Sequence, residues 1–317
     1  MKTYAGAKTL TQQNKRSLLA KGLKKYWVFY ILAIIPVAYL LVFKFWPIVL
    51  QIVLSTKKYT IKGGVWNSKF VGLDNFKKLF RDDDFRQLFI NTLRISVLRL
   101  TCGFFPPIIL AIFLFDLTST RFRRISQSIL YIPHFFSWVI IYGIVQVLFS
   151  STGFINYLLE FLGLQKKEFL LETKYFLPVL IGSGLWKGLG WGTIIYLAAL
   201  TSINTELYEA AKLDGAGPLQ RIRYITIPGI TGVIMFVLIM DLGKLLSAAN
   251  TEQILLFYGP ANYDISDTIG TWVYRQGLGK LQYSLSAAVS FFESCIGMLL
   301  VLLSNWLGKK YVGVGVW

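Results

Sequence analysis

Six apolar runs divide this chain, and each is long enough to cross a lipid bilayer. They cover residues 28–54, 88–115, 127–149, 177–200, 228–247 and 286–306. A membrane-spanning helix needs roughly 20 apolar residues, and its backbone groups must pair with one another because the hydrocarbon core holds no water. The sequence is 55% hydrophobic and 15% charged, and no stretch predicts a separate soluble domain. We therefore predict an all-α membrane protein with six transmembrane helices.

Polar tails flank the apolar runs. We expect a basic cytoplasmic tail over 1–27, a six-helix transmembrane domain over 28–306 and a short cytoplasmic tail over 307–317. The net charge of +17 is scattered through the loops, which favours contact with the membrane surface over nucleic-acid binding. Lys and Arg divide almost evenly between the two sides, so charge alone does not set the orientation.

A polar stretch at 202–228 interrupts the apolar pattern between the fourth and fifth runs. Glu209, Ala210 and Ala211 favour a helix, and Asp214-Gly215 favours its end, because glycine adopts the backbone conformation that closes a helix. Pro218 suits the first turn of a second helix. The stretch predicts a compact helix-turn-helix that projects from the bilayer.

This stretch resembles the EAA loop of ABC importer permeases. The matching residues are Glu209, Ala210, Ala211, Asp214, Gly215 and Ala216. Ile222 stands where the family has Phe, and Ile227 stands where it usually has Leu. The resemblance implies a loop that docks onto a cytoplasmic ATPase, and it therefore places both chain termini in the cytoplasm.

Other motifs extend the resemblance over about 28–306, to the carbohydrate-uptake (maltose-type) branch of type I ABC permeases and its polysaccharide/oligosaccharide subfamily. They are Phe43-Lys-Phe-Trp-Pro47, Phe70-Val-Gly-Leu-Asp-Asn-Phe76, Asn91-Thr-Leu93 and Leu130-Tyr-Ile-Pro-His-Phe-Phe-Ser-Trp138. The resemblance implies a type I importer fold in the plasma membrane of a bacterium. It implies as partners a second homologous permease, two ATPase subunits, an extracellular solute-binding protein and an oligosaccharide substrate. The outer segments 56–86 and 248–285 are expected to receive the binding protein.

The chain shows no sequence motif for nucleotide or metal chemistry. A Walker motif is absent, so ATP and Mg²⁺ are expected to act on the partner ATPase and no cofactor on this chain. His134 is the single histidine, for which a hydrogen bond at a helix end is the simpler interpretation. Cys102 and Cys295 both fall in apolar runs and suit packing.

Six ionisable residues fall inside predicted spans. They are Arg94, Arg99, Lys187, Asp241, Lys244 and Glu293. Each charge costs roughly 2.5–3.5 kcal/mol at the bilayer centre, so these side chains should face the bundle interior, a cavity or one another. Asp241 and Lys244 share a helix face and form either an internal ion pair or part of a ligand site. Arg99 and Glu293 are expected to pair.

The resemblance also implies sugar contacts on the helices that flank the EAA-like loop. Aligned on that loop, they fall on Lys187, Gly188, Trp191, Asp241, Lys244, Leu245 and Ala248. The family usually has uncharged residues at several of these positions. The intramembrane charges sum to +2, which favours an acidic oligosaccharide and leaves a neutral one as the alternative. Trp191 either stacks on a sugar ring or packs in the bundle.

The sequence argues against two other classes of function. An intramembrane glycan-lipid modifying enzyme would need a catalytic constellation, and the acidic cluster Asp82-Asp83-Asp84 lies in a charge-rich outer loop that suits a solvated surface better. A channel or scaffold would have no use for a loop that docks an ATPase. The sequence therefore favours a transporter subunit without an ATPase site of its own.

Overall fold

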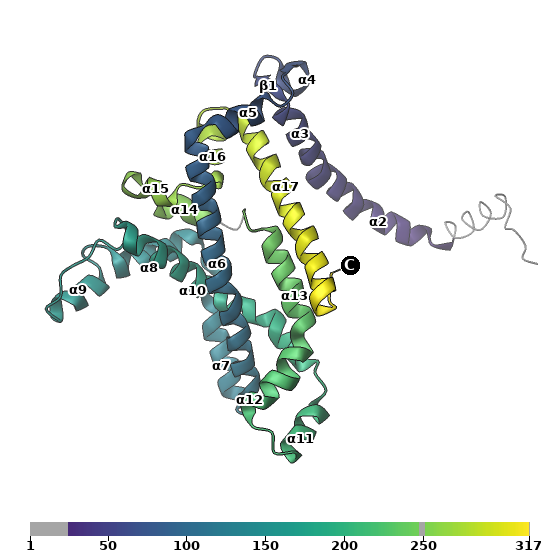
Figure 1. The fold of residues 1–317 in the computed structure, drawn as a ribbon, viewed down its shortest axis with the longest axis vertical. Coiled ribbons are helices and arrows are strands. Elements are labelled where there is room, and N and C mark those ends of the chain that lie inside the picture. The colour runs from purple at the N-terminus through teal and green to yellow at the C-terminus, as the bar shows by residue number, and fades with distance from the viewer. Residues whose placement is uncertain (1–24, 247–250, 317) are drawn as a thin grey trace, which may run out of the picture.

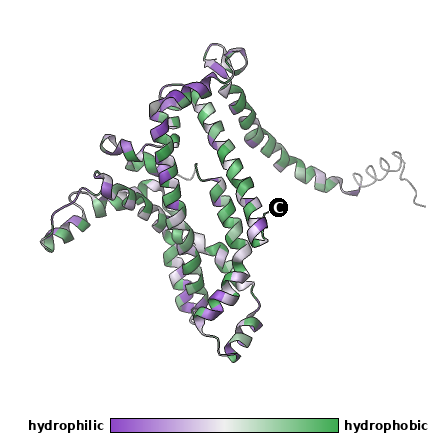
Figure 2. Cartoon of the chain, viewed as in Figure 1, coloured by the Kyte–Doolittle hydropathy of each residue, from purple (hydrophilic) through white to green (hydrophobic). Residues whose placement is uncertain are grey.

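A computed structural model of the chain describes residues 25–246 and 251–316. The described chain is mostly helical (Figure 1). Residues along the long helices are mainly hydrophobic, whereas hydrophilic residues gather towards the two ends of the bundle (Figure 2). This distribution suits a bundle that crosses a membrane.

Helices form at each of the six apolar runs. Their bounds are α2 Trp27–Leu40 and α3 Trp46–Ser55 for the first run, α6 Asp83–Asp116 for the second, α8 Trp138–Phe149 for the third, α10 Thr173–Thr201 for the fourth, α13 Ile227–Gly243 for the fifth and α17 Tyr283–Leu307 for the sixth. Within the described residues, five helices are long and apolar enough to cross a membrane, counting α8 together with α9 (Phe154–Phe161) as one. The fourth run, in α10, is not among the five, and the count of six spans stays a prediction.

Helix α10 is less apolar than the five, and part of its surface is buried against other helices. It contains five glycines and Lys187 between residues 182 and 192, and it buries ten side chains or glycine positions. Its main neighbour is α6, and a cluster of buried residues that includes Tyr196, Leu200 and Ile230 joins it to α6 and α13. A helix surrounded by protein needs less apolar surface than one that faces lipid.

The predicted third span, 127–149, is wrong at its start. Residues up to Tyr131 belong to a separate helix, α7 Thr120–Tyr131, and a 3-10 turn at Ile132–Phe135 follows it. Pro133 lies in that turn, and the hydroxyl of Ser137 accepts a hydrogen bond from the backbone N–H of Ile140 at 3.3 Å. Proline lacks an N–H and serine caps a new helix, so the chain starts α8 at Trp138.

The first span, Trp27–Ser55, is one helical stretch with an irregular turn inside it. A π-helical turn at Leu41–Phe45 joins α2 to α3. Helix α3 packs on α17, whereas α2 buries no residue and diverges from the other helices (Figure 1). Every side chain of α2 is thus available to lipid or to another chain.

The polar end opposite α11 (Thr205–Leu213) and α12 (Pro218–Arg221) contains the one departure from an all-α fold among the described residues. Strands β1 Lys57–Thr60 and β2 Ser68–Phe70 pair antiparallel, with Lys57 opposite Phe70. They enclose α4 Gly64–Asn67 and are followed by α5 Asp74–Arg81. A strand ladder can form here because this segment lies outside the apolar runs.

The two predicted outer segments meet at this end. The remaining short helices are α14 Thr251–Phe257, α15 Tyr263–Ser266 and α16 Ile269–Tyr274. The amide of Asn91, which is 1% exposed, donates hydrogen bonds to the carbonyl oxygens of Asp264 at 2.9 Å and Asp267 at 3.0 Å. Arg275 forms an ion pair with Asp267, whose hydrogen bonds raise the pKa of Arg275 above its usual range. Buried Leu79 and Phe85 pack in one cluster with Ile269 and Trp272, so the segment 56–86 and helix α16 form one surface.

Gly190 is expected to be intolerant of any side chain, because α7 and α10 touch there. A Cβ atom at Gly190 would lie 2.0 Å from the backbone carbonyl oxygen of Leu130, and backbone cannot move aside as a side chain can. Gly190→Ala should lower the melting temperature of the purified permease in detergent, with a loss of about 1–3 kcal/mol. Gly182→Ala on the same helix meets no atom within 4 Å and should leave that temperature unchanged.

Candidate functional site

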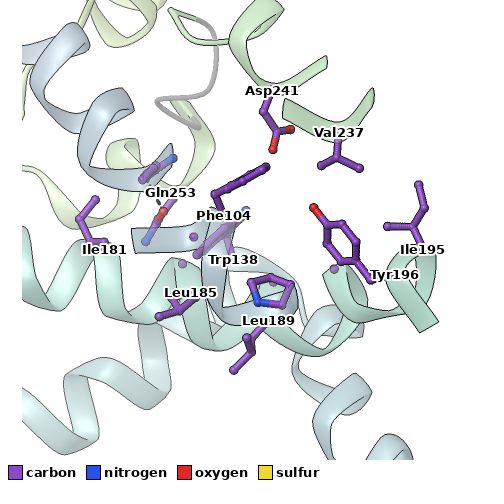
Figure 3. Close-up of a pocket in the computed structure, with 16 residues that line it drawn as sticks. Phe104, Trp138, Ile181, Leu185, Leu189, Ile195, Tyr196, Val237, Asp241 and Gln253 are labelled. Carbon is purple, nitrogen blue, oxygen red and sulfur yellow. Dashed lines mark hydrogen bonds between the residues drawn. The ribbon is translucent and has the colours of Figure 1, made fainter. Parts of the chain in front are cut away.

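A cavity of about 350 Å³ lies among α6, α8, α10, α13 and α14 (Figure 3). Its volume falls within the roughly 300–1,000 Å³ range of small-molecule sites. Its lining residues are Arg99, Gly103, Phe104, Pro107, Trp138, Ile181, Gly184, Leu185, Gly188, Leu189, Gly192, Ile195, Tyr196, Val237, Asp241 and Gln253. The five helices thus build an apolar chamber with a few polar groups in its wall.

The polar groups gather on two sides of the cavity. Gln253 lies on one side, while Asp241 and Tyr196 lie on the other, with Phe104 and Trp138 between them (Figure 3). Arg99 is beside Gln253, and its Nη2 donates a hydrogen bond to Oε1 of Gln253 at 2.5 Å. A cation and a carboxylate therefore occupy different parts of one cavity.

Glycines of α10 make room for this cavity. Gly184, Gly188 and Gly192 are spaced four residues apart and all line it, because residues i and i+4 share a helix face. A Cβ atom at Gly188 would meet nothing within 4 Å. Gly188 is one of the predicted sugar-contact residues, and the structure places it in the cavity wall.

Lys187 and Trp191 lie on a different face of α10 from Gly188. The Nζ of Lys187 donates hydrogen bonds to the carbonyl oxygens of His134, at 2.7 Å, and of Phe136. Trp191 stacks on His134 with ring centroids 4.3 Å apart and planes 3° apart. Neither residue lines the cavity. The pair instead joins α10 to the break between α7 and α8.

The four predicted residues after the EAA-like loop are placed differently from one another. Asp241 lines the cavity. Lys244 is exposed just after the end of α13, and its backbone N–H donates to the carbonyl oxygen of Asp241 at 3.2 Å. Leu245 is buried at 8% exposure and does not line the cavity. Ala248 lies outside the described residues.

The predicted ion pair between Arg99 and Glu293 is wrong. Arg99 lines the cavity described above and bonds to Gln253. Glu293 lines a separate cavity of about 330 Å³ between α13 and α17, with Ser290, Ser294 and other residues of these helices. Spacing along two different helices could not show that the two charges line separate cavities.

The EAA-like stretch forms a helix, a turn and a second helix. Helix α11 spans Thr205–Leu213 and α12 spans Pro218–Arg221. Gly215 has φ +77°, and the N–H of the next residue, Ala216, bonds to the carbonyl oxygen of Ala211 at 2.8 Å. This is the closure that a left-handed glycine permits at a helix end. The local geometry predicted for Asp214-Gly215 and Pro218 is therefore confirmed.

This helical pair projects at one end of the bundle (Figure 1) and exposes apolar side chains. Leu213 is 90% exposed and Leu219 is 80% exposed. Glu209, Ala210 and Asp214 are exposed as well, while Ala211 and Ala216 are half-buried. The hydroxyls of Tyr208 and Thr226, 3.0 Å apart, tie α11 to the base of α13. The tip is suited to a protein contact, and its base would pass a displacement to α13.

Sequence reasoning missed Gln253, Tyr196, Phe104 and Trp138 as site residues. The repeat of glycines at 184, 188 and 192 was the signal that could have located the cavity wall. Within the described part of the chain, no group of three or more His, Cys, Asp and Glu residues could hold a metal ion.

Comparison with known proteins now defines the class of protein. Residues 103–312 match the family of binding-protein-dependent transport system inner membrane components, and the chain belongs to this family. It is a multi-pass membrane protein and a permease subunit of an ABC importer, because its relatives are permeases and not enzymes.

Two relatives and one solved structure are similar to this chain over most of its length. The chain is 38% identical to the polygalacturonan/rhamnogalacturonan transport system permease protein YteP of Bacillus subtilis, over 96% of this chain and 95% of that one. It is 37% identical to protein LplB of the same organism, over 96% and 95% of the two chains. A chain in the crystal structure of a bacterial alginate ABC transporter, in complex with an alginate pentasaccharide-bound periplasmic protein, superposes with a TM-score of 0.85 at 35% identity. That likeness covers 93% of this chain and 99% of the other.

Proposed function

We propose that this chain is one of two permease subunits through which a bacterial ABC importer moves an acidic oligosaccharide across the plasma membrane. The observation that carries the substrate class is the cavity, in which Arg99, Asp241 and three aromatic side chains line one chamber. Relatives support it, since the alginate transporter imports an acidic polysaccharide. Family membership favours transport over the alternatives of a glycan-lipid modifying enzyme or a scaffold.

The remaining parts of the transport cycle are assigned to partners. A second homologous permease completes the pathway, two ATPase subunits use ATP and Mg²⁺, and an extracellular solute-binding protein delivers the sugar. Cofactors are assigned to the ATPase subunits and none to this chain. Helices α11 and α12, with Glu209, Asp214 and Gly215, dock onto the ATPase. Rigid helices suit this role, since packed bundles switch between discrete arrangements.

The orientation follows from these assignments. The tip of α11 and α12 faces the cytoplasm, together with the tails 1–27 and 307–317. The surface formed by β1, β2, α5 and α16 lies at the opposite end of the bundle (Figure 1) and receives the binding protein. Exposed Trp66 and Tyr274 on this surface suit a transient protein interface.

Uptake by the complete transporter tests the substrate class. Both permeases, the ATPase and the binding protein would be reconstituted in proteoliposomes and offered labelled tetragalacturonate or maltotetraose. We expect ATP-dependent accumulation of the acidic sugar alone. Equal accumulation of both sugars, or of maltotetraose only, would contradict the acidic assignment and leave the family assignment intact.

A further inference from the structure

The partly buried guanidinium of Arg99 is held in place on one side of the cavity by a chain of hydrogen bonds. Nη2 of Arg99, on α6, donates to Oε1 of Gln253, on α14, at 2.5 Å. Gln253 is 0% exposed, and its Nε2 donates to the carbonyl oxygen of Leu180 at 2.8 Å and to Oγ of Ser183 at 2.9 Å. Since α10 fixes the amide and the amide fixes the guanidinium, Arg99 has a defined position before any ligand arrives.

The rest of the cavity is complementary to an acidic sugar ring. A hexuronate has a carboxylate at one edge of its ring and hydroxyls at the opposite edge. Asp241 and Tyr196, which lie across the cavity from Gln253 (Figure 3), can accept hydrogen bonds from such hydroxyls. Phe104 and Trp138 lie between the two polar sides (Figure 3), where an aromatic face can pack on the apolar face of the ring.

Arg99 is the basic side chain that lines this cavity in the described part of the chain. Lys187 is held by the carbonyl oxygens of His134 and Phe136, and Lys244 is exposed beyond the lining. Arginine also suits the task better than lysine, because its planar fork of N–H donors matches the two oxygens of a carboxylate. Attraction between the two charges is strong where water is excluded.

We propose that Arg99, positioned by Gln253, binds the carboxylate of the transported acidic sugar and so determines the preference for acidic over neutral oligosaccharides. This assignment rests on the proposed function and names the residue that recognises the charge. Arg99 lies on α6, outside the set of residues that the sequence predicted to contact the sugar.

The test compares Arg99→Gln and Arg99→Lys with the wild type in the complete reconstituted transporter, using labelled tetragalacturonate. Charge-assisted hydrogen bonds are strong enough that their loss should lower kcat/KM for uptake about 10-fold or more in Arg99→Gln. Arg99→Lys keeps the charge without the fork, and it should fall between Arg99→Gln and the wild type. Arg94→Gln is the matched control, since Arg94 lies exposed on the same helix and its loss should leave uptake unchanged.

A second comparison in the same experiment changes the charge of the substrate. Methyl-esterified tetragalacturonate keeps the sugar and removes the charge, so its uptake, once normalised to binding-protein affinity, should be equal in the wild type and Arg99→Gln. Equal losses for both substrates would indicate a purely structural role and overturn the assignment. Normal tetragalacturonate uptake by Arg99→Gln would also overturn it, while the proposed function would stand. Should Arg99→Gln fail to assemble, Arg99→Lys alone decides, and wild-type kcat/KM in that variant contradicts the proposal.

Discussion

Replacing Gly188 with leucine is expected to stop transport while the permease stays folded. Gly188 lines the cavity, and a Cβ atom there would meet nothing within 4 Å, so the longer side chain enters empty space. Inside a helix, leucine is favoured over glycine by up to about 1 kcal/mol, so stability should hold or rise. We therefore expect uptake of the oligosaccharide to fall at least about 10-fold, because the side chain occupies the volume that the sugar needs.

Uptake in proteoliposomes and the melting temperature of the purified complex would be measured together. Gly143→Leu is the matched control, since Gly143 is an exposed helical glycine on α8 that also meets no atom within 4 Å. It should keep both wild-type uptake and wild-type stability. Wild-type uptake by Gly188→Leu would show that the sugar does not pass through this cavity.

Replacing Gly215 with valine is expected to uncouple ATP hydrolysis from transport. Gly215 has φ +77° between α11 and α12, where a residue with a Cβ is strained by about 1–2 kcal/mol and a β-branched one by more. The strain should open the closure in which the N–H of Ala216 bonds to the carbonyl oxygen of Ala211. The exposed tip would then present Leu213 and Leu219 in a different arrangement to the ATPase.

The readouts are the amount of ATPase that co-purifies with the permease and the stimulation of ATP hydrolysis by the loaded binding protein. We expect at least one of them to fall about 10-fold. Gly217→Ala is the control, because Gly217 has φ −68° and a Cβ there would make only an ordinary contact, 3.8 Å from Oε1 of Gln220. Full assembly with full stimulation in Gly215→Val would refute the coupling role.

Helical spacing explains why some of the predicted sugar-contact residues line the cavity and others do not. Asp241 and Gly188 were named from the sequence, and both line the cavity. Lys187 precedes Gly188 by one residue, which is 100° around a helix of 3.6 residues per turn. The two residues therefore point in different directions, and Lys187 contacts the break after α7 while Gly188 faces the cavity. The separation follows from helix geometry alone.

The sequence predicted the interior position of Arg99 but not its hydrogen-bond partner. The cost of a charge inside the membrane predicted that Arg99 must face the interior or a partner, and this expectation is confirmed. Its partner, Gln253, comes from a short helix 154 residues further along the chain. Gln253 lies in the segment 248–285, which was predicted to be an outer loop, so its amide was not expected inside the bundle and a pairing of Arg99 with Glu293 was predicted instead.

By itself, the sequence determined the features of this protein that depend on neighbouring residues. Apolar runs longer than a bilayer is thick predicted the long helices, and Gly215 and Pro218 predicted the turn between α11 and α12, because the backbone limits of glycine and proline are local. Only the tertiary structure decided which intramembrane side chains share a cavity. Arg99, Tyr196, Asp241 and Gln253 lie on four different helices, and their meeting depends on how those helices pack, which no spacing within a single helix specifies.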